Sequence, residues 1–194
     1  MPITRPRQDL CLDFVNTRYW RGSEKPTEQL NDFTDLLSWI SRAALAANEK
    51  LSAPAPAERG AELLVEAIDL RETICRIFSA LAKGDEMAEQ DFMALERALA
   101  EAPPRDALAR ADGRYGWKIT EPTVTTPQLL APVLWSAGDL LVEAPRHRIR
   151  CCANPKCRWL FLDGSKSGTR RWCQMSACGN REKARRHYSK VRKS

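Results

Sequence analysis

Apolar residues recur every three or four positions over long stretches of the first 145 residues, which is the period of an amphipathic helix. These stretches begin at Leu30, Leu63, Phe92 and Leu130. Between the last two, the segment 108–119 carries Asp112-Gly113 near its middle, and this dipeptide favours a tight β-turn. The pattern predicts a mainly α fold for residues 1–145, with one short β-hairpin.

The pattern changes over residues 146–194, which contain few aliphatic side chains. Segments 159–163 and 169–173 read as two strands, and the residues between them are typical of a turn. A helix is expected to follow with Asn180 as its N-cap. Its apolar positions, expected to face the hairpin, are Ala184, Tyr188 and Val191. We therefore expect a small ββα-like domain over 146–194 beside a helical domain over 1–145.

Four cysteines stand out in the smaller domain. They are Cys152, Cys157, Cys173 and Cys178, and they form two C-x4-C pairs with fifteen residues between the pairs. Each pair supplies two thiolates from one tight turn, and this spacing is typical of a four-cysteine zinc site. A segment this short and poor in aliphatic residues needs the stability that a metal supplies. The sequence predicts that Zn²⁺ is bound by these four residues.

Two alternatives concern the same cysteines. In the first alternative, the four cysteines form disulfides or remain buried thiols. The chain opens without a signal peptide, which favours a cytoplasmic location, and disulfides are rare there. In the second alternative, Cys151, which adjoins Cys152, is the first ligand in its place. We prefer Cys152, because it reproduces the spacing of the second pair. Cys11 and Cys75 lie in apolar helical patterns and are interpreted as core thiols.

Charge divides the chain at the same place as the hydrophobic pattern. Residues 1–145 carry 16 Lys and Arg against 23 Asp and Glu, whereas residues 146–194 carry 15 against 2. A net charge near +13 on a small metal-ordered domain favours binding to phosphates. The alternative is a solvated tail that docks on the acidic domain or keeps the protein soluble.

The basic residues expected to contact nucleic acid lie around and after the second cysteine pair. They are Arg170, Arg171, Arg181, Lys183, Arg185 and Arg186. DNA is the expected partner and RNA the alternative, since single-strand RNA binders expose aromatic rings for base stacking. Trp159, Phe161 and Trp172 are the candidate rings, and we expect at least two of them to form a small core instead.

The sequence disfavours an enzyme and a membrane protein. Both histidines, His147 and His187, lie in the basic region, so the helical domain has none for acid–base catalysis. No apolar run approaches the length of a membrane span.

A polar pair interrupts an apolar run near the N-terminus. Asp13 and Asn16 lie three positions apart, and Trp20 follows them. One hypothesis is that these three residues line a pocket for a small-molecule effector. The alternative is that the polar side chains bond to nearby backbone groups, which is what buried polar side chains usually do.

The C-terminal segment resembles a known family. The blocks Arg170-Arg171-Trp172-Cys173 and Cys178-Gly179-Asn180-Arg181, with the upstream segment 159–163, are similar to the CGNR zinc finger of bacterial proteins. The segment 12–17 near the N-terminus resembles the ABATE domain, which accompanies this finger in a family of stress-induced transcriptional regulators. The resemblance implies DNA binding by the finger and a regulatory helical domain. Our own hypothesis is that the helical domain senses a ligand or forms a homodimer.

Overall fold

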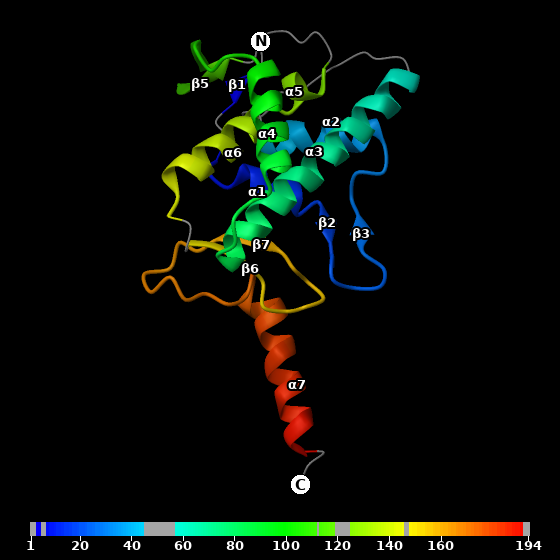
Figure 1. Cartoon of the computed structure of the whole chain (residues 1–194), viewed down its shortest axis with the longest axis vertical. Coiled ribbons are helices and arrows are strands. Elements are labelled where there is room, and N and C mark those ends of the chain that lie inside the picture. Colours follow the sequence, from blue (N-terminus) through cyan, green and yellow to red (C-terminus); the bar gives the residue numbers. More distant parts are fainter. Residues whose placement is uncertain are drawn as a thin grey trace.

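The computed structural model describes residues 3–4, 7–44, 57–111, 113–118, 125–145 and 148–191. The helices are α1 (Leu10–Val15), α2 (Phe33–Ala44), α3 (Ala57–Lys83), α4 (Glu89–Glu101), α5 (Thr126–Leu129), α6 (Ala131–Glu143), a π-helical turn η2 (Met175–Gly179) and α7 (Asn180–Val191). The strands are β1 (Ile3–Thr4), β2 (Arg18–Tyr19), β3 (Thr27–Glu28), β4 (Leu108–Ala111), β5 (Arg114–Lys118), β6 (Ile149–Cys151) and β7 (Leu160–Leu162). Figure 1 shows α1 to α6 gathered in one body, β6 and β7 beneath it, and α7 extending away towards the C-terminus.

The long helix α3 lies at the centre of this body and packs against α1, α2, α4 and α5. Its apolar stripe is buried as its helical period predicts, and includes Leu63, Ala67, Ile74, Ile77, Phe78 and Leu81. The other three predicted helical stretches correspond to α2, α4 and α6. The prediction of a mainly α fold is confirmed.

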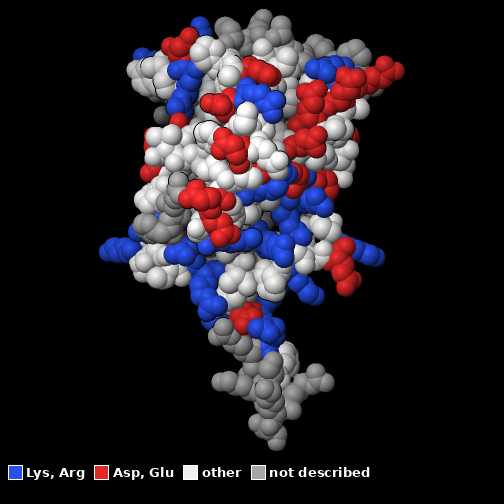
Figure 2. Space-filling model, viewed as in Figure 1, with Lys and Arg blue, Asp and Glu red and all other residues white. Residues whose placement is uncertain are grey.

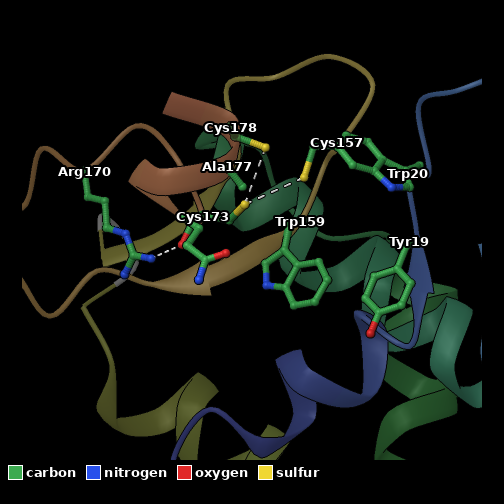
Figure 3. A pocket seen from close by; sticks show the side chains of 9 residues that line it. Tyr19, Trp20, Cys157, Trp159, Arg170, Cys173, Ala177 and Cys178 are labelled. Atoms are coloured by element: carbon green, nitrogen blue, oxygen red, sulfur yellow. Dashed lines mark hydrogen bonds between the residues drawn. The ribbon is translucent and has the colours of Figure 1, made fainter. Parts of the chain in front are cut away.

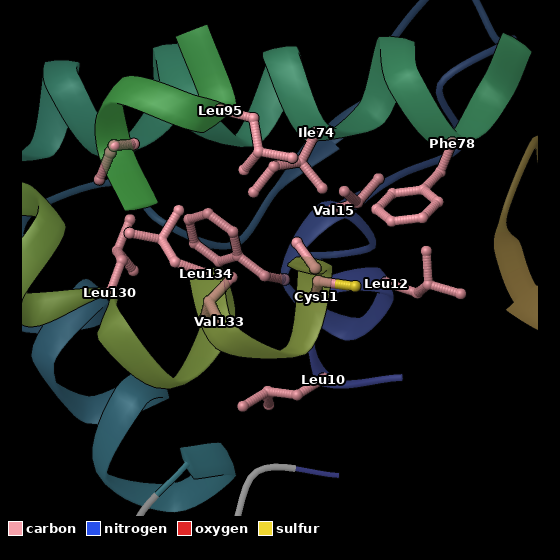
Figure 4. Close-up of a cluster of buried hydrophobic side chains, with 14 of the residues drawn as sticks. Leu10, Cys11, Leu12, Val15, Ile74, Phe78, Leu95, Leu130, Val133 and Leu134 are labelled. Atoms are coloured by element: carbon pink, nitrogen blue, oxygen red, sulfur yellow. The ribbon is translucent and has the colours of Figure 1, made fainter. Parts of the chain in front are cut away.

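The short helix α1 crosses the interior of the body. Five of its six residues are buried, because α3, α6 and β7 all pack against it. Figure 4 shows Leu10, Cys11, Leu12 and Val15 of α1 among side chains from α3, α4 and the α5–α6 region. A helix that is apolar over most of its surface belongs in a core, and only Asp13 of α1 reaches the surface.

The predicted β-hairpin of the larger domain is confirmed. Strands β4 and β5 pair antiparallel, with Ala111 opposite Arg114 across the turn. The two-residue strand β1 adds to the other edge of β5, and Thr4 lies opposite Trp117. Pairing between segments so far apart in the sequence leaves no local sequence pattern, and the third strand was not expected.

The hairpin predicted in the C-terminal segment is wrong in its pairing. Strand β7 pairs with β6, which precedes the first cysteine pair, and residues 169–173 form no strand. The carboxylate of Asp163 accepts hydrogen bonds from the backbone N–H groups of Ser165 and Arg170, at 3.0 and 2.9 Å. These bonds fold residues 163–170 into a compact loop, so the chain does not return along β7.

The C-terminal helix also differs from the prediction. The helical backbone starts one turn earlier than expected, because the π-helical turn η2, which contains Cys178, runs directly into α7 at Asn180. Asn180 is therefore not an N-cap, and its side-chain amide donates to the Ser176 carbonyl instead. Ala184 and Tyr188 are exposed rather than packed on a hairpin, since α7 extends away from the body (Figure 1). The structure does not describe the side chain of Val191, so the expectation for this residue is not tested.

The hairpin formed by β6 and β7 belongs to two cores at once. Ile149 and Leu160 are buried in the main core of the helical body, while Phe161 packs with the cysteines. Successive residues of a strand point to opposite faces, which is why Leu160 and Phe161 join different cores. The metal-binding segment is thus attached to the helical body through shared apolar packing.

Candidate metal centre

The first cysteine pair is presented by a tight turn after β6. The backbone N–H of Cys152 donates to the Trp159 carbonyl at 2.8 Å, and that of Cys157 donates to the Asn154 carbonyl at 2.9 Å. The Asn154 side chain accepts from the Lys156 N–H and approaches the Cys178 sulfur. These contacts direct both sulfurs of the pair towards the second pair.

The second pair comes from the loop and turn that precede α7. The sulfur of Cys173 lies 3.7 Å from that of Cys157 and 3.8 Å from that of Cys178. All four cysteine sulfurs lie within 4.8 Å of one another. Zn–S bonds of about 2.3 Å in a tetrahedron place the sulfurs about 3.8 Å apart, whereas a disulfide needs about 2.05 Å. The four sulfurs therefore form a group that can hold a metal ion, and none of them is disulfide-bonded.

Strand alternation separates Cys152 from its neighbour Cys151. Cys151 lies on the same face of β6 as Ile149 and packs against the main core. Burial raises the pKa of its thiol, which disfavours the thiolate that a metal needs. Cys152, one residue later, turns into the cysteine group.

The close packing of the sulfurs perturbs their acidity. Hydrogen bonding from the thiols of Cys157 and Cys173 lowers the pKa of Cys152. The same contacts with Cys152 raise the pKa values of Cys157 and Cys173. Neighbouring thiolates repel one another, so four of them at this separation require a compensating cation.

Arginine side chains surround the cysteines and pack on aromatic rings. The guanidinium of Arg170 lies 4.5 Å from the Phe161 ring centroid and donates to the carbonyls of Trp172 and Cys173. Arg171 lies 5.4 Å from the ring of Trp172. Phe161 is buried, and Trp159 and Trp172 pack with it, so the expected small aromatic core is present. These arginines contribute to the local structure as well as to its charge.

The remaining residues expected to bind nucleic acid lie on α7. Arg181 and Lys183 are exposed, and the Arg181 guanidinium lies 4.6 Å from the Trp20 ring. Arg185 pairs with Glu182 through two contacts of 2.9 Å, which partly neutralises its charge. The side chain of Arg186 lies outside the described side chains. Figure 2 shows basic residues gathered in a belt below the helical body, whereas acidic residues are frequent on the surface above that belt.

The residues proposed to line one effector pocket lie apart. Asn16 is buried, donates to the Leu160 carbonyl at 2.7 Å and accepts from the Leu160 N–H at 3.0 Å. Asp13 points outward and pairs with Arg7. The expectation of a shared pocket is therefore corrected, because Asn16 is used to connect α1 to β7. Trp20 alone of the three lines a described pocket, which lies beside the cysteines.

Sequence reasoning missed that residues after α1 complete the metal-binding region. Tyr19 and Trp20 pack beside the cysteines, and the Gly22 N–H donates to the Lys156 carbonyl at 3.2 Å. The aromatic pair followed by an arginine was a visible signal, but nothing local connects it to residues more than a hundred positions later.

An ion-pair network fixes the segment that carries this aromatic pair. Arg71 of α3 is fully buried and forms two 2.6 Å contacts with Glu28 of β3. Glu72 pairs with Arg21 at 2.6 Å. Burial is the largest single influence on Glu28 and works against its charged form. The hydrogen bonds and positive charge of Arg71, with hydrogen bonds from the Leu30 and Gln29 N–H groups, together outweigh it and lower the pKa of this carboxyl. The β2–β3 segment is therefore attached firmly to α3.

Comparison with protein-family models gives two matches. Residues 8–144 match ABATE, described as "Putative stress-induced transcription regulator", and residues 148–191 match the CGNR zinc finger. No curated protein matches the chain. In the described part of the chain, no helix is long and apolar enough to cross a membrane. The matches cover both parts of the sequence in order, and the chain therefore belongs to the ABATE family and carries a C-terminal CGNR zinc finger.

Proposed function

We propose that the chain is a zinc-dependent DNA-binding transcription regulator. The observation that carries this proposal is a basic surface built around four clustered cysteines and continued along an exposed helix. Thiolate ligands in a closed tetrahedral group favour Zn²⁺, and a structural zinc of this kind stabilises the fold without taking part in a reaction. Cys152, Cys157, Cys173 and Cys178 would hold it.

Two parts of the finger are suited to different contacts with DNA. The helix α7 extends beyond the body, and its exposed Arg181 and Lys183 are accessible to a groove or to phosphates. Arg170 and Arg171 lie near the cysteines and extend the basic surface. Because Arg170 and Arg181 already pack on aromatic rings, their guanidinium groups are ordered before DNA arrives.

The helical domain would act by positioning the finger and by responding to a signal. The hydrogen bonds between Asn16 and Leu160 and the shared packing of Ile149 connect α1 and α3 to the metal-binding region. A ligand that binds the helical domain, or a second copy of the chain, would act through these contacts. In this proposal, residues 1–145 form the regulatory domain and residues 146–194 form the DNA-binding finger.

RNA binding is the second candidate, and one observation favours it. Trp159 is partly exposed and stacks with Tyr19 beside the basic surface, which is an arrangement that accepts unpaired bases. Most of the other finger aromatics are used in the small core.

The test is a measurement of affinity for duplex DNA as a function of salt. If about five cationic side chains reach phosphates, log affinity against log salt has a slope of about −4 to −5. Lys183→Ala should reduce this slope by about one and weaken binding to all duplexes alike. Arg97→Ala, an exposed arginine of α4, is the matched control and should leave the slope unchanged. Tighter binding to single-stranded RNA than to any duplex DNA at equal salt would replace DNA with RNA in the proposal.

A further inference from the structure

A pocket of about 410 Å³ opens between β2 and the cysteine turns. Besides three of the cysteines, its lining includes Tyr19, Trp20, Trp159, Arg170, Gln174 and Ala177. The first two of these residues come from the segment after α1, and the others come from the finger. We call it the aromatic pocket. Its volume lies within the roughly 300–1,000 Å³ of small-molecule sites in proteins.

Flat aromatic surfaces dominate one side of the aromatic pocket. The rings of Tyr19 and Trp159 are stacked, with centroids 5.3 Å apart and an interplanar angle of 9°. Figure 3 shows these two rings side by side, with Trp20 above Tyr19, the cysteine sulfurs above Trp159 and Arg170 at the left of the view. A planar aromatic ligand would extend such a stack, whereas a branched aliphatic ligand would not match it.

Positive charge and a hydrogen-bonding group complete the aromatic pocket. Arg170 lines it, and Arg181 lies against the Trp20 ring at 4.6 Å. Gln174 is exposed, and its side-chain amide carries both donors and an acceptor. It makes no capping hydrogen bond to η2. This combination suits a flat ring with polar edges that is attached to an anionic group.

The backbone on both sides of the aromatic pocket is strained. Among the described residues, Trp20 and Arg158 are the non-glycine residues with positive φ, at 54° and 55°. Such conformations are costly for side chains with a Cβ and occur preferentially at ligand sites and switches. In this chain they orient Trp20 and the segment leading to Trp159 at the same pocket.

We propose that the aromatic pocket binds a nucleobase, which either belongs to a free nucleotide or is an unpaired base of a nucleic-acid strand. The stacked rings take the flat face of the base, Gln174 bonds its edge, and the arginines attract the attached phosphate. This goes beyond binding to paired duplex DNA, because phosphate and groove contacts need no pocket. A base in this position would also bridge the helical domain and the finger.

The test uses the zinc-loaded full-length chain and four probes. They are a paired DNA duplex, the same duplex with one extra unpaired base, that duplex with an abasic residue in place of the extra base, and AMP. Base stacking on aromatic side chains corresponds to an affinity difference of roughly 5- to 140-fold. We expect the unpaired base to improve binding over the abasic duplex by a factor in this range, or AMP to bind with saturation and quench tryptophan fluorescence.

Each outcome has a defined meaning. Preference for the unpaired base assigns the pocket to strands, and binding of AMP alone assigns it to a free nucleotide. Equal affinity for the unpaired and abasic duplexes, together with no AMP binding, would overturn the proposal. Affinity for the paired duplex, measured in the same series, tests the DNA-binding function separately.

Substitutions locate the effect in the aromatic pocket. Ala177→Phe places a bulky ring inside it and should abolish the base-dependent gain while preserving affinity for paired duplex. Ala61→Phe, at an exposed position of α3, is the matched control and should change neither. If Ala177→Phe lowers metal content or helicity, Gln174→Ala replaces it and should change the preference among the four unpaired bases. An undiminished, unaltered base preference in a folded variant would refute the assignment.

Discussion

The position of a single side chain on a strand determines which of two adjacent cysteines joins the group that can hold a metal ion. Cys151 and Cys152 are adjacent and chemically identical, and in the sequence only the C-x4-C spacing of the second pair favours Cys152. Because Cys151 shares a face with Ile149, it enters the main core, and Cys152 is directed to the other cysteines. The burial of the Asn16 side chain also depends on a single partner. Its amide bonds to both the carbonyl and the N–H of Leu160, so a polar side chain can be buried there.

The first prediction separates the two neighbouring cysteines by metal content. Cys152→Ser should lose its metal in competition with a chelator, because only three thiolates remain. Cys151→Ser should retain about one zinc per chain, as expected of an intact four-cysteine site. Elemental analysis after dialysis against the chelator measures both. Retention in Cys152→Ser with loss in Cys151→Ser would reassign the ligand.

Among the elements, the hairpin of β6 and β7 is the one that connects the two parts of the chain. It lies between the main core of the helical body and the small core beside the cysteines, and its residues alternate between them. Leu160 is 1% exposed in the main core, and Phe161 is 7% exposed beside the cysteines. We infer that the hairpin stays folded on α1 and α3 when the metal is removed, because its packing on the helical body does not depend on the cysteines.

The second prediction tests this division of the hairpin. Leu160→Ala should lower the free energy of unfolding by about 2–5 kcal/mol, with metal or with chelator present. Phe161→Ala should be destabilising with metal, and its effect should shrink in chelator, because the small core depends on the cysteine group. Chemical denaturation followed by circular dichroism measures these changes. If the cost of Leu160→Ala disappears in chelator, the hairpin unfolds together with the metal site.

At the scale of the whole molecule, the finger is placed by contacts from several separate segments. The segment after α1 reaches it through Tyr19, Trp20 and Gly22, and the ion pairs of Arg71 with Glu28 attach that segment to α3. A Cβ at Gly22 would lie 1.8 Å from the Pro155 carbonyl oxygen, so the two backbones can approach this closely only because the residue is glycine.

The third prediction uses this close approach. Gly22→Ala should separate the β2–β3 segment from the first cysteine turn, because a backbone carbonyl must move to admit the methyl group. We expect a lower melting temperature and weaker DNA binding without a change in metal content. Gly164→Ala is the matched control, since nothing lies within 4 Å of its Cβ. Equal behaviour of the two variants would show that the contact does not position the finger.

The helical character, the short hairpin of the larger part and the cysteine group could all be predicted from local patterns. The helical period, the turn residues and the paired cysteines are all defined by the spacing of residues along the chain, which can be read without knowing the fold. The partner of β7 could not be predicted in this way, because the Asp163 carboxylate competes for the backbone groups that a return strand would use.

Several features depend on segments that are distant in the sequence. The third strand β1, the contact of Asn16 with Leu160 and the aromatic pocket each bring together residues more than a hundred positions apart. The direction of α7 is of the same kind, because its start is anchored at the cysteines and its few apolar residues do not suffice to pack it on the body. Local spacing specifies which side chains can ligate a metal or line a helix face. Which neighbours they meet follows from packing of the complete chain, where burial and backbone hydrogen bonding are satisfied together.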